Sequence, residues 1–234
     1  MGPQAQLLQP KALPRKRETG RQVAFAAWIL LAAVLLLPNA HAAEVRVRLV
    51  PDGDTVRLTD DRRVRLAGID APETGMQDGR PEYFAAEARV RLQALTNNRP
   101  LTLESDNDDR YGRVIGWLYD NDGRLLNEVL VAEGFATFYH HAGNDASLQQ
   151  RLLDAQHRAM DARAGFWARI LAIPAPPEGW IGNRRSRRFH HPNSTYAGQI
   201  AARNRIVFNT TEEAFRAGHA PARGGFPWPM AGDG

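Results

Sequence analysis

A short turn rich in carboxylates opens the part of the chain that can do chemistry: Asp52-Gly53-Asp54-Thr55. Asp-Gly pairs are typical of tight turns, so the carboxylates of Asp52 and Asp54 are expected close together between two strands. Hard cations such as Ca²⁺ bind clustered carboxylate oxygens. The turn is therefore a candidate metal site, although a plain turn with two solvated acids would have the same sequence.

A second cluster combines one arginine with two acids. Arg65 lies in a predicted strand, whose side chains alternate between its two faces. Asp70 follows at the end of that strand, and Pro72 then turns the chain. This turn can bring Asp70 and Glu73 toward Asp54, so that three carboxylates converge. The alternative is a surface arginine followed by a polar loop.

A third cluster, Asp109-Arg110-Tyr111-Gly112-Arg113, lies where a loop enters a predicted strand. Gly112 permits close approach of the backbone, and Arg113 can aim at an anion. A solvated basic turn explains the same residues. This cluster alone therefore does not distinguish an anion-binding site from a solvated turn.

Several other kinds of site are excluded. The chain has no cysteine, which rules out disulfides, thiolate catalysis and thiolate metal sites. The run Asp106-Asn107-Asp108 hints at a helix–loop–helix calcium loop, but Tyr111 stands where that loop requires glycine. His140-His141 has no carboxylate or third histidine at a ligand spacing nearby, and the nucleophile-elbow pattern of serine hydrolases is absent.

Five short strands are predicted around these clusters. Strict alternation of apolar and polar residues marks the first, and turn residues separate it from the next two, so these three form an antiparallel meander. Asp122-Gly123, a pair typical of hairpin turns, ends the last predicted strand. The predicted strands are residues 44–50, 55–58, 64–69, 101–104 and 114–119, and the acidic residues 106–109 are predicted to be a loop.

Three helices are predicted between and after the strands. Residues 81–97 begin with a proline in the first turn and carry apolar residues at helical spacing. Residues 125–133 form a short helix that a glycine ends, and a third helix, capped by Asp145 or Ser147, runs to about residue 162. Five short strands with three helices predict an α+β fold. Its centre is a β-barrel like the oligonucleotide/oligosaccharide-binding fold (OB-fold), followed by a small C-terminal extension.

Residues 1–42 are predicted to be a secretory signal peptide. A basic segment, 11–21, precedes the apolar run 25–37, and Ala40-His41-Ala42 has the small-x-small pattern of a cleavage site. This run is shorter than a membrane span, which needs about 20 apolar residues. An uncleaved membrane anchor is the alternative interpretation. Both interpretations place the following domain in the periplasm or outside the cell, and cleavage leaves no integral membrane span.

The rest of the chain divides into three parts by composition. Residues 43–170 contain the charged clusters and the predicted elements, and are expected to form one domain. Residues 171–179 are a Pro-rich linker. Residues 180–234 form a small C-terminal module, whose Gly/Pro-rich end, residues 224–234, is predicted to be disordered.

Charge is distributed unevenly along the chain, whose net charge is +4. Residues 1–42 hold five bases and one acid, and the rest holds 25 of each. Within that rest, residues 43–170 have a net charge of −4 and residues 171–234 of +4. Contact with a nucleic acid must therefore come from local clusters. Residues 183–188 hold four arginines, for which phosphate contact and a solvated linker are both open.

Taken in order, these clusters resemble the motifs of the staphylococcal nuclease (thermonuclease) family over residues 45–167. The matching stretches are residues 52–55, 64–74, 109–113 and 126–128, with Trp167 closing the domain. The resemblance implies an OB-fold-like barrel and cleavage of nucleic acids.

The resemblance also implies roles for individual residues. Asp54 and Asp70 match the family's calcium-ligating carboxylates, and Ala71 matches a ligand that binds through its backbone carbonyl. The implied catalytic residues are Arg65 and Arg113, which match two phosphate-binding arginines, and the carboxylate Glu73.

Four further residues are implied to bind substrate: Arg110, Tyr111, Tyr139 and His140. Tyr111 matches a residue near the phosphate of the bound nucleotide. The family's base-stacking tyrosine falls at His140, and Tyr139 stands one place earlier. Affinity and base preference are therefore expected to differ from the family pattern.

The predicted function is that of an exported, calcium-dependent endonuclease, acting as a monomer on DNA, with RNA as a further candidate substrate. In this interpretation Ca²⁺ neutralises a phosphate oxygen, the two arginines stabilise transition-state charge, and Glu73 orients or deprotonates the attacking water. Two alternatives stay open. One is a non-catalytic nucleic-acid-binding module on the same fold, and the other is an envelope protein that binds a non-nucleic ligand.

Overall fold

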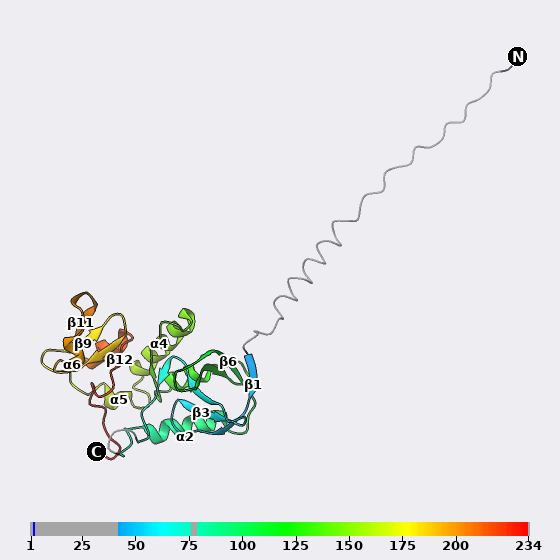
Figure 1. The fold of residues 1–234 in the computed structure, drawn as a ribbon, viewed down its shortest axis with the longest axis horizontal. Coiled ribbons are helices and arrows are strands. Elements are labelled where there is room, and N and C mark those ends of the chain that lie inside the picture. The colour runs from blue at the N-terminus through cyan, green and yellow to red at the C-terminus, as the bar shows by residue number, and fades with distance from the viewer. Residues whose placement is uncertain (1, 3–41, 76–78, 234) are drawn as a thin grey trace. The chain divides into compact units, whose positions relative to one another are not determined.

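The computed structural model describes residue 2 and residues 42–75 and 79–233. The predicted signal peptide lies outside these residues, apart from Gly2 and Ala42. From residue 42 onward the chain forms a six-stranded sheet, drawn in blue to green, and a four-stranded sheet nearer the C-terminus, drawn in yellow to red (Figure 1). In this part of the chain every helix is too short or too polar to cross a membrane.

The six-stranded sheet closes on itself. Its strands follow the order β1-β6-β7-β4-β3-β2, yet only Arg46 separates β1 from β2 in the chain. The two edges must therefore lie together, which makes the sheet a small barrel and confirms the predicted α+β fold of OB type. The strands are β1 (Ala42–Val45), β2 (Val47–Leu49), β3 (Thr55–Leu58), β4 (Arg63–Leu66), β6 (Leu101–Asp108) and β7 (Val114–Tyr119).

Two predicted strands have different limits in the structure. The first, residues 44–50, is divided at Arg46 because its halves pair with different neighbours, β6 and β3. The fourth extends to Asp108, so residues 106–108 are strand rather than the predicted loop. Pairing of this segment with Val114 and Ile115 of β7 outweighs the low strand propensity of Asp and Asn.

Gly68 interrupts the third predicted strand, residues 64–69. Its φ is +72°, and a Cβ there would lie 2.6 Å from Leu152 Cδ1, so glycine is required at this bend. Beyond the bend Ile69–Asp70 forms a separate strand, β5, which pairs with β8 (Thr137–Phe138). The bend thereby takes Asp70 out of the barrel sheet and places it beside β8.

The three predicted helices are present: α2 (Ala85–Thr96), α3 (Leu126–Ala132) and α4 (Ala146–Asp161). Asp145 caps α4, because its side chain accepts hydrogen bonds from two backbone N–H groups of the first turn. Helix α2 starts later than the predicted range 81–97. Phe84 has a φ of +73°, and Glu82 forms a β-bridge with Met230, so neither residue is helical.

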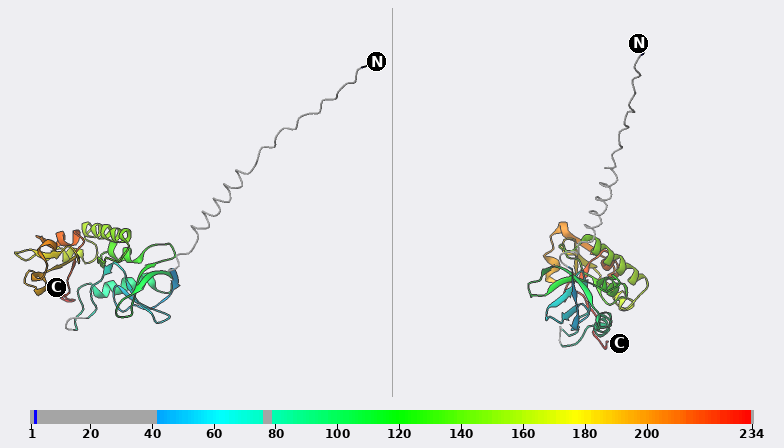
Figure 2. Two further views of the ribbon diagram at one scale, coloured as in Figure 1. Left: turned by 45° about the horizontal axis from the view of Figure 1, so that its top comes forward. Right: turned by 90° about the vertical axis from the view of Figure 1, so that its right-hand side faces the viewer.

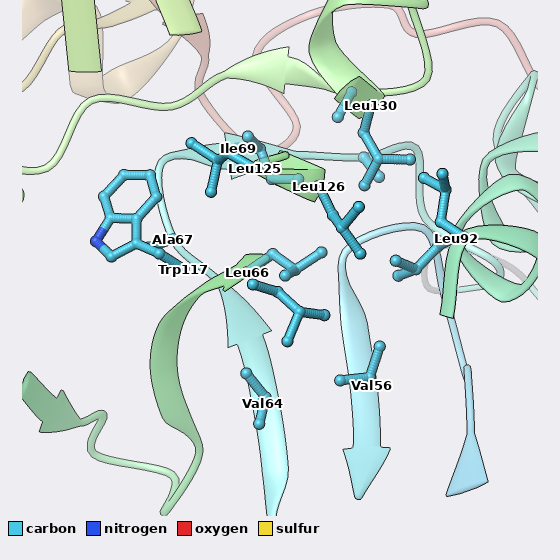
Figure 3. Close-up of a cluster of buried hydrophobic side chains, with 14 of the residues drawn as sticks. Val56, Val64, Leu66, Ala67, Ile69, Leu92, Trp117, Leu125, Leu126 and Leu130 are labelled. Atoms are coloured by element: carbon cyan, nitrogen blue, oxygen red, sulfur yellow. The ribbon is translucent and has the colours of Figure 1, made fainter. Parts of the chain in front are cut away.

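Helices α2 and α3 supply much of the core that fills the barrel (Figure 3). Leu92 of α2 and Leu126 and Leu130 of α3 are fully buried, as are Val56 and Val64 of the facing strands. Burial of large aliphatic side chains is the main favourable term in folding. The barrel and its helices therefore form one core.

One buried amide fastens α3 to the barrel. Asn127 is fully buried, its Nδ2 donates to the carbonyl of Ala67 at 2.8 Å, and its Oδ1 accepts the N–H of Leu118 at 3.1 Å. These bonds satisfy backbone groups just after β4 and inside β7. They hold the chain immediately before the bend at Gly68.

The C-terminal module is built on the second sheet, with strand order β11-β9-β10-β12 (Figures 1 and 2). Its aromatic core includes Trp180, Phe189 and Phe215. Trp167, near the end of the predicted domain 43–170, packs into this core, with its ring centroid 5.0 Å from that of Phe215. The elements are α5 (Trp167–Ile170), β9 (Trp180–Asn183), β10 (Arg188–His190), α6 (Thr195–Gly198), η1 (Ala202–Asn204), β11 (Arg205–Phe208), α7 (Thr211–Arg216) and β12 (Ala220–Pro221).

The end of the chain differs from the predicted disorder of residues 224–234. Phe226 packs against Trp180 with ring centroids 5.3 Å apart, and Trp228 packs against Phe166 at 5.2 Å. The indole N–H of Trp228 also donates to the carbonyl of Tyr83 at 3.1 Å. Burial of two large aromatic rings outweighs the Gly/Pro-rich composition, so residues 224–233 lie against the folded chain.

Candidate active site

Arg65 lies between two carboxylates. Its Nη1 is 2.8 Å from Asp54 Oδ2, and its Nη2 is 2.6 Å from Asp70 Oδ1. Nη1 also donates to the carbonyl of Ile69 at 3.0 Å. The side chain is 16% exposed, so these contacts fix the orientation of the guanidinium. The structure thus brings Asp54, Arg65 and Asp70 into one cluster.

Local packing and hydrogen bonds hold Asp54 in place. Its Oδ2 accepts the N–H of Ala71 at 2.8 Å, and its own N–H donates to Asp52 Oδ1 at 3.1 Å. Gly53 has no room for a Cβ, which would lie 2.7 Å from the Cβ atoms of Ala71 and Ala88. The acidic turn is therefore pressed between α2 and the loop that follows β5.

Negative charge exceeds positive charge at this cluster. Burial raises the pKa of Asp54, Arg65 lowers it, and the carboxylates of Asp52 and Asp70 raise it further. One guanidinium therefore faces three carboxylates, an excess that fits a hard divalent cation bound through oxygen. Among residues 42–75 and 79–233 no three His, Asp or Glu side chains are grouped to hold a metal. A cation here needs further oxygen atoms, such as the carbonyl of Ala71 or water.

Glu73 lies on the loop that follows β5. Its backbone N–H donates to Glu82 Oε2 at 2.7 Å, and its Oε1 lies 3.1 Å from Nη2 of Arg223. Burial raises the pKa of Glu73, and the charge of Arg223 opposes that rise. A carboxylate whose pKa is raised toward neutrality accepts protons more readily at neutral pH, as a general base must.

The predicted residues Arg110, Tyr111 and Arg113 form a group of their own. Arg113 Nε and Nη2 each lie 2.8 Å from Asp109 Oδ2. The guanidinium carbon of Arg110 lies 4.8 Å from the centre of the Tyr111 ring, and Tyr111 is 64% exposed. This group presents two cations and an aromatic face to solvent.

Sheet register relates this group to Arg65. Arg113 directly precedes β7, and Ile115 of β7 pairs with Arg65 in parallel register. Arg113 therefore lies two residues before the partner of Arg65 in the parallel register of β4 and β7. Its guanidinium is bonded to Asp109.

Tyr139 and His140 follow directly from β8, whose Thr137 pairs with Asp70. The guanidinium of Arg188, in β10, lies 3.4 Å from the centre of the Tyr139 ring and donates to the carbonyl of His140 at 3.3 Å. Burial lowers the pKa of His140, which favours the neutral form of its ring. The C-terminal module thus contacts the segment that is predicted to bind the base.

A cleft of about 460 Å³ opens beside Glu73. One wall comes from the loop between Asp70 and Glu73 together with Glu82, and the other comes from residues 221–230, which include Arg223. Neither Glu82 nor Arg223 is predicted as a site residue from the sequence. Glu82 falls in a predicted helix, and Arg223 is an isolated arginine in a segment without a motif.

Comparisons with known proteins match the same part of the chain. The family model described as "Staphylococcal nuclease homologue" matches residues 63–169. A protein named "Uncharacterized endonuclease" from Escherichia coli is 32% identical over 154 residues, which are 64% of this chain and 90% of that protein. A micrococcal nuclease from Shigella flexneri is 32% identical over 170 residues, which are 67% of this chain and 91% of the relative.

Proposed function

Because the chain belongs to the staphylococcal nuclease family and is therefore a nuclease, we propose that it is an exported, calcium-dependent endonuclease acting on DNA, with RNA as a second substrate. One observation carries the proposal: the guanidinium of Arg65 is fixed between the carboxylates of Asp54 and Asp70. A planar cation beside oxygen ligands for a metal suits an anionic diester. Residues 43–170 carry this activity, and the chain acts as a monomer.

Arg65 and Arg113 bind the phosphate in this proposal. Each guanidinium offers paired N–H donors that match two phosphate oxygens. A donor aimed at an oxygen whose charge grows in the transition state contributes about 3–4 kcal/mol, or about 10²–10³ in rate. Arg65 is oriented before substrate binds, and Arg113 approaches the same phosphate from the neighbouring strand.

Glu73 is the proposed acceptor of the proton from the attacking water. Its raised pKa supports this role, and it lies three residues after Asp70, on the loop that follows β5. The metal ligands are Asp54, Asp70 and the carbonyl of Ala71. A divalent cation held by these residues would supply Lewis acidity.

The nucleotide is proposed to contact Arg110, Tyr111, Tyr139 and His140. The exposed ring of Tyr111 with its stacked Arg110 suits the sugar–phosphate backbone. Arg188 covers one face of Tyr139, so stacking on the base is assigned to His140. A single imidazole offers little hydrogen-bond readout, and cleavage should depend weakly on base identity.

Plasmid nicking tests the activity. Purified residues 43–234 should convert supercoiled plasmid to open circles with Ca²⁺, and excess chelator should stop the reaction. Parallel assays on single-stranded RNA test the second substrate. Binding without cutting across several divalent cations would support the alternative, a non-catalytic nucleic-acid-binding module.

Export is supported by the signal-peptide pattern of residues 1–42, and β1 begins at Ala42, where that pattern ends. Expression of the full chain in a Gram-negative host, followed by N-terminal sequencing, tests it. A periplasmic or secreted product should start at Ala43. A full-length product in the membrane fraction would instead support an uncleaved anchor, and one in the cytoplasm would contradict export.

A further inference from the structure

The cleft beside Glu73 is bounded by a part of the chain that the family match does not reach. It lies between the loop of Asp70 and Glu73 and residues 221–230, whereas the match ends at residue 169. Small-molecule sites have volumes of about 300–1,000 Å³, so about 460 Å³ is enough for one nucleotide unit. A group bound here would lie next to the proposed catalytic carboxylate.

Arg223 presents its guanidinium to this cleft. Its Nη2 lies 3.1 Å from Glu73 Oε1, and its side chain is 78% exposed. A guanidinium carries five N–H donors, and within the described residues Glu73 is the one polar partner of Arg223. An ion pair this exposed contributes little to stability, so a phosphate can replace Glu73 as the partner of Arg223.

The backbone on both sides of Arg223 is held in place. On one side β12 pairs with β10, and the N–H of Ala222 donates to the carbonyl of Phe189 at 2.9 Å. On the other side Phe226 is packed against Trp180. Arg223 therefore projects from a supported segment, and its position relative to Glu73 is set by the packing of the C-terminal module.

The other cleft residues complement a nucleotide. Pro227 and Trp228 provide apolar surface on the same wall as Arg223, and such surface accepts any base or sugar. Arg80 also lines the cleft, but it is bonded to Asp233 Oδ1 at 2.8 Å and to the carbonyl of Ala231. Arg223 is therefore the cation best placed to accept a phosphate.

We propose that Arg223 is a third phosphate-binding arginine of this nuclease. The cleft binds the nucleotide that neighbours the scissile phosphate on the same strand. This inference rests on the proposed function. It assigns part of the substrate site to the C-terminal module, which lies outside the residues that match the family.

Arg223→Ala and Arg223→Lys test the inference in the chain from residue 43 to 234. Arg203→Ala is the matched control, because Arg203 precedes β11, at the opposite edge of the module's sheet from β12. Two substrates are compared: a single-stranded DNA oligonucleotide, and bis(4-nitrophenyl) phosphate, which has no neighbouring phosphate. Initial rates are measured at several salt concentrations.

The Arg223→Ala variant should have a KM for the oligonucleotide raised about tenfold, with kcat changed less than about twofold. The slope of log KM against log salt should fall by about 0.7, which corresponds to one lost phosphate contact on a single strand. The KM for bis(4-nitrophenyl) phosphate, which has no neighbouring phosphate, should rise much less than the KM for the oligonucleotide. Arg223→Lys should recover part of the affinity for the oligonucleotide, and Arg203→Ala should match the wild type.

An unchanged KM and salt slope in Arg223→Ala would overturn the inference. A raised kcat would overturn it as well, because Arg223 would then restrain Glu73 rather than bind substrate. If the wild type cuts neither substrate, the proposed function fails. Oligonucleotide affinities of the same variants, measured by fluorescence anisotropy with Ca²⁺ present, then still test whether Arg223 binds phosphate.

Discussion

The carboxylate of Asp54 accepts the backbone N–H of Ala71 at 2.8 Å. This bond ties the acidic turn before β3 to the loop that carries Glu73, directly after Asp70 of β5. The geometry of the site therefore depends on Asp54 as a hydrogen-bond acceptor, and its electrostatics depend on Asp54 as a charge. Replacing the carboxylate of Asp54 by an amide keeps the hydrogen-bond acceptor and removes the charge, so it separates the two contributions.

Asp54→Asn should abolish stabilisation by Ca²⁺ while the fold is kept, because the amide oxygen still accepts from Ala71 but carries no charge. Ca²⁺ at about 100 times its Kd stabilises a one-site protein by about 2.7 kcal/mol. For a chain of this size that raises Tm by about 5–10 °C. Calorimetry with Ca²⁺ and with chelator measures the shift in both proteins.

Asp60→Asn is the control for this prediction, since Asp60 forms an exposed ion pair with Arg62 and the chemical change is the same. It should keep the full shift in Tm. An equal shift in Asp54→Asn would mean that Ca²⁺ binds elsewhere.

Arg65→Ala and Arg113→Ala should each lower kcat/KM by about 10²–10³ through loss of transition-state stabilisation, but their stabilities should differ. Removal of Arg65 leaves Asp54 buried without its counter-charge and should cost about 3–5 kcal/mol. Removal of Arg113 breaks a more exposed pair with Asp109 and should cost about 1 kcal/mol. Steady-state kinetics measure the change in kcat/KM, and urea unfolding measures the change in stability. Near-wild-type turnover by either variant would contradict the phosphate-binding role of that arginine.

Asn127→Ala should destabilise the protein by about 3 kcal/mol, because it leaves the carbonyl of Ala67 and the N–H of Leu118 buried without partners. Urea unfolding measures the change. Gln150→Ala, an exposed amide on α4, should change stability by less than about 0.5 kcal/mol. Equal effects in the two variants would show that the buried hydrogen bonds of Asn127 contribute nothing.

His219 should make the protein less stable in mild acid. Burial lowers its pKa to about 4, its side chain is 2% exposed, and its Nε2 has no hydrogen-bond partner in the described part of the chain. In the unfolded chain a histidine binds a proton near pH 6.5. Between these two values the unfolded state binds more protons, so stability falls as the pH drops.

The expected slope is at most about 1.36 kcal/mol per pH unit from pH 6.5 down to pH 4, with no contribution from His219 above pH 6.5. Urea unfolding at several pH values, compared with His219→Gln, isolates this contribution. The difference in stability between the two proteins should change across that window and be constant above it. A constant difference at every pH would contradict the buried neutral histidine.

Sequence patterns predict the individual strands and the cluster of Asp54, Arg65 and Asp70, because both depend on neighbours in the chain. Alternation of apolar residues gives the strands, and Asp54, Arg65 and Asp70 come from consecutive short elements joined by turns. The requirement for glycine at the Gly68 bend is not predictable in this way, since a Cβ there would collide with Leu152 of α4, which is distant in the chain. The limits of β6 likewise depend on its partner strand.

The place of Arg223 beside Glu73 could not be predicted from local sequence patterns either. It is 150 residues from Glu73 in the chain, and the aromatic packing of the C-terminal module brings the two together. Composition predicts disorder for residues 224–234, because Gly and Pro are frequent and large apolar residues are few. Packing of Phe226 and Trp228 against the folded chain holds that segment, together with backbone hydrogen bonds from Tyr83 to Pro229 and from Ala231 to Pro81.

The aromatic cluster also makes the module visible to spectroscopy. Of the four tryptophans in the described residues, Trp167, Trp180 and Trp228 belong to this cluster, and Trp117 belongs to the barrel. Intrinsic fluorescence therefore reports mainly on the C-terminal module, whereas far-UV circular dichroism also reports on the barrel. A red shift in emission that precedes the loss of ellipticity would show that the module opens before the barrel unfolds.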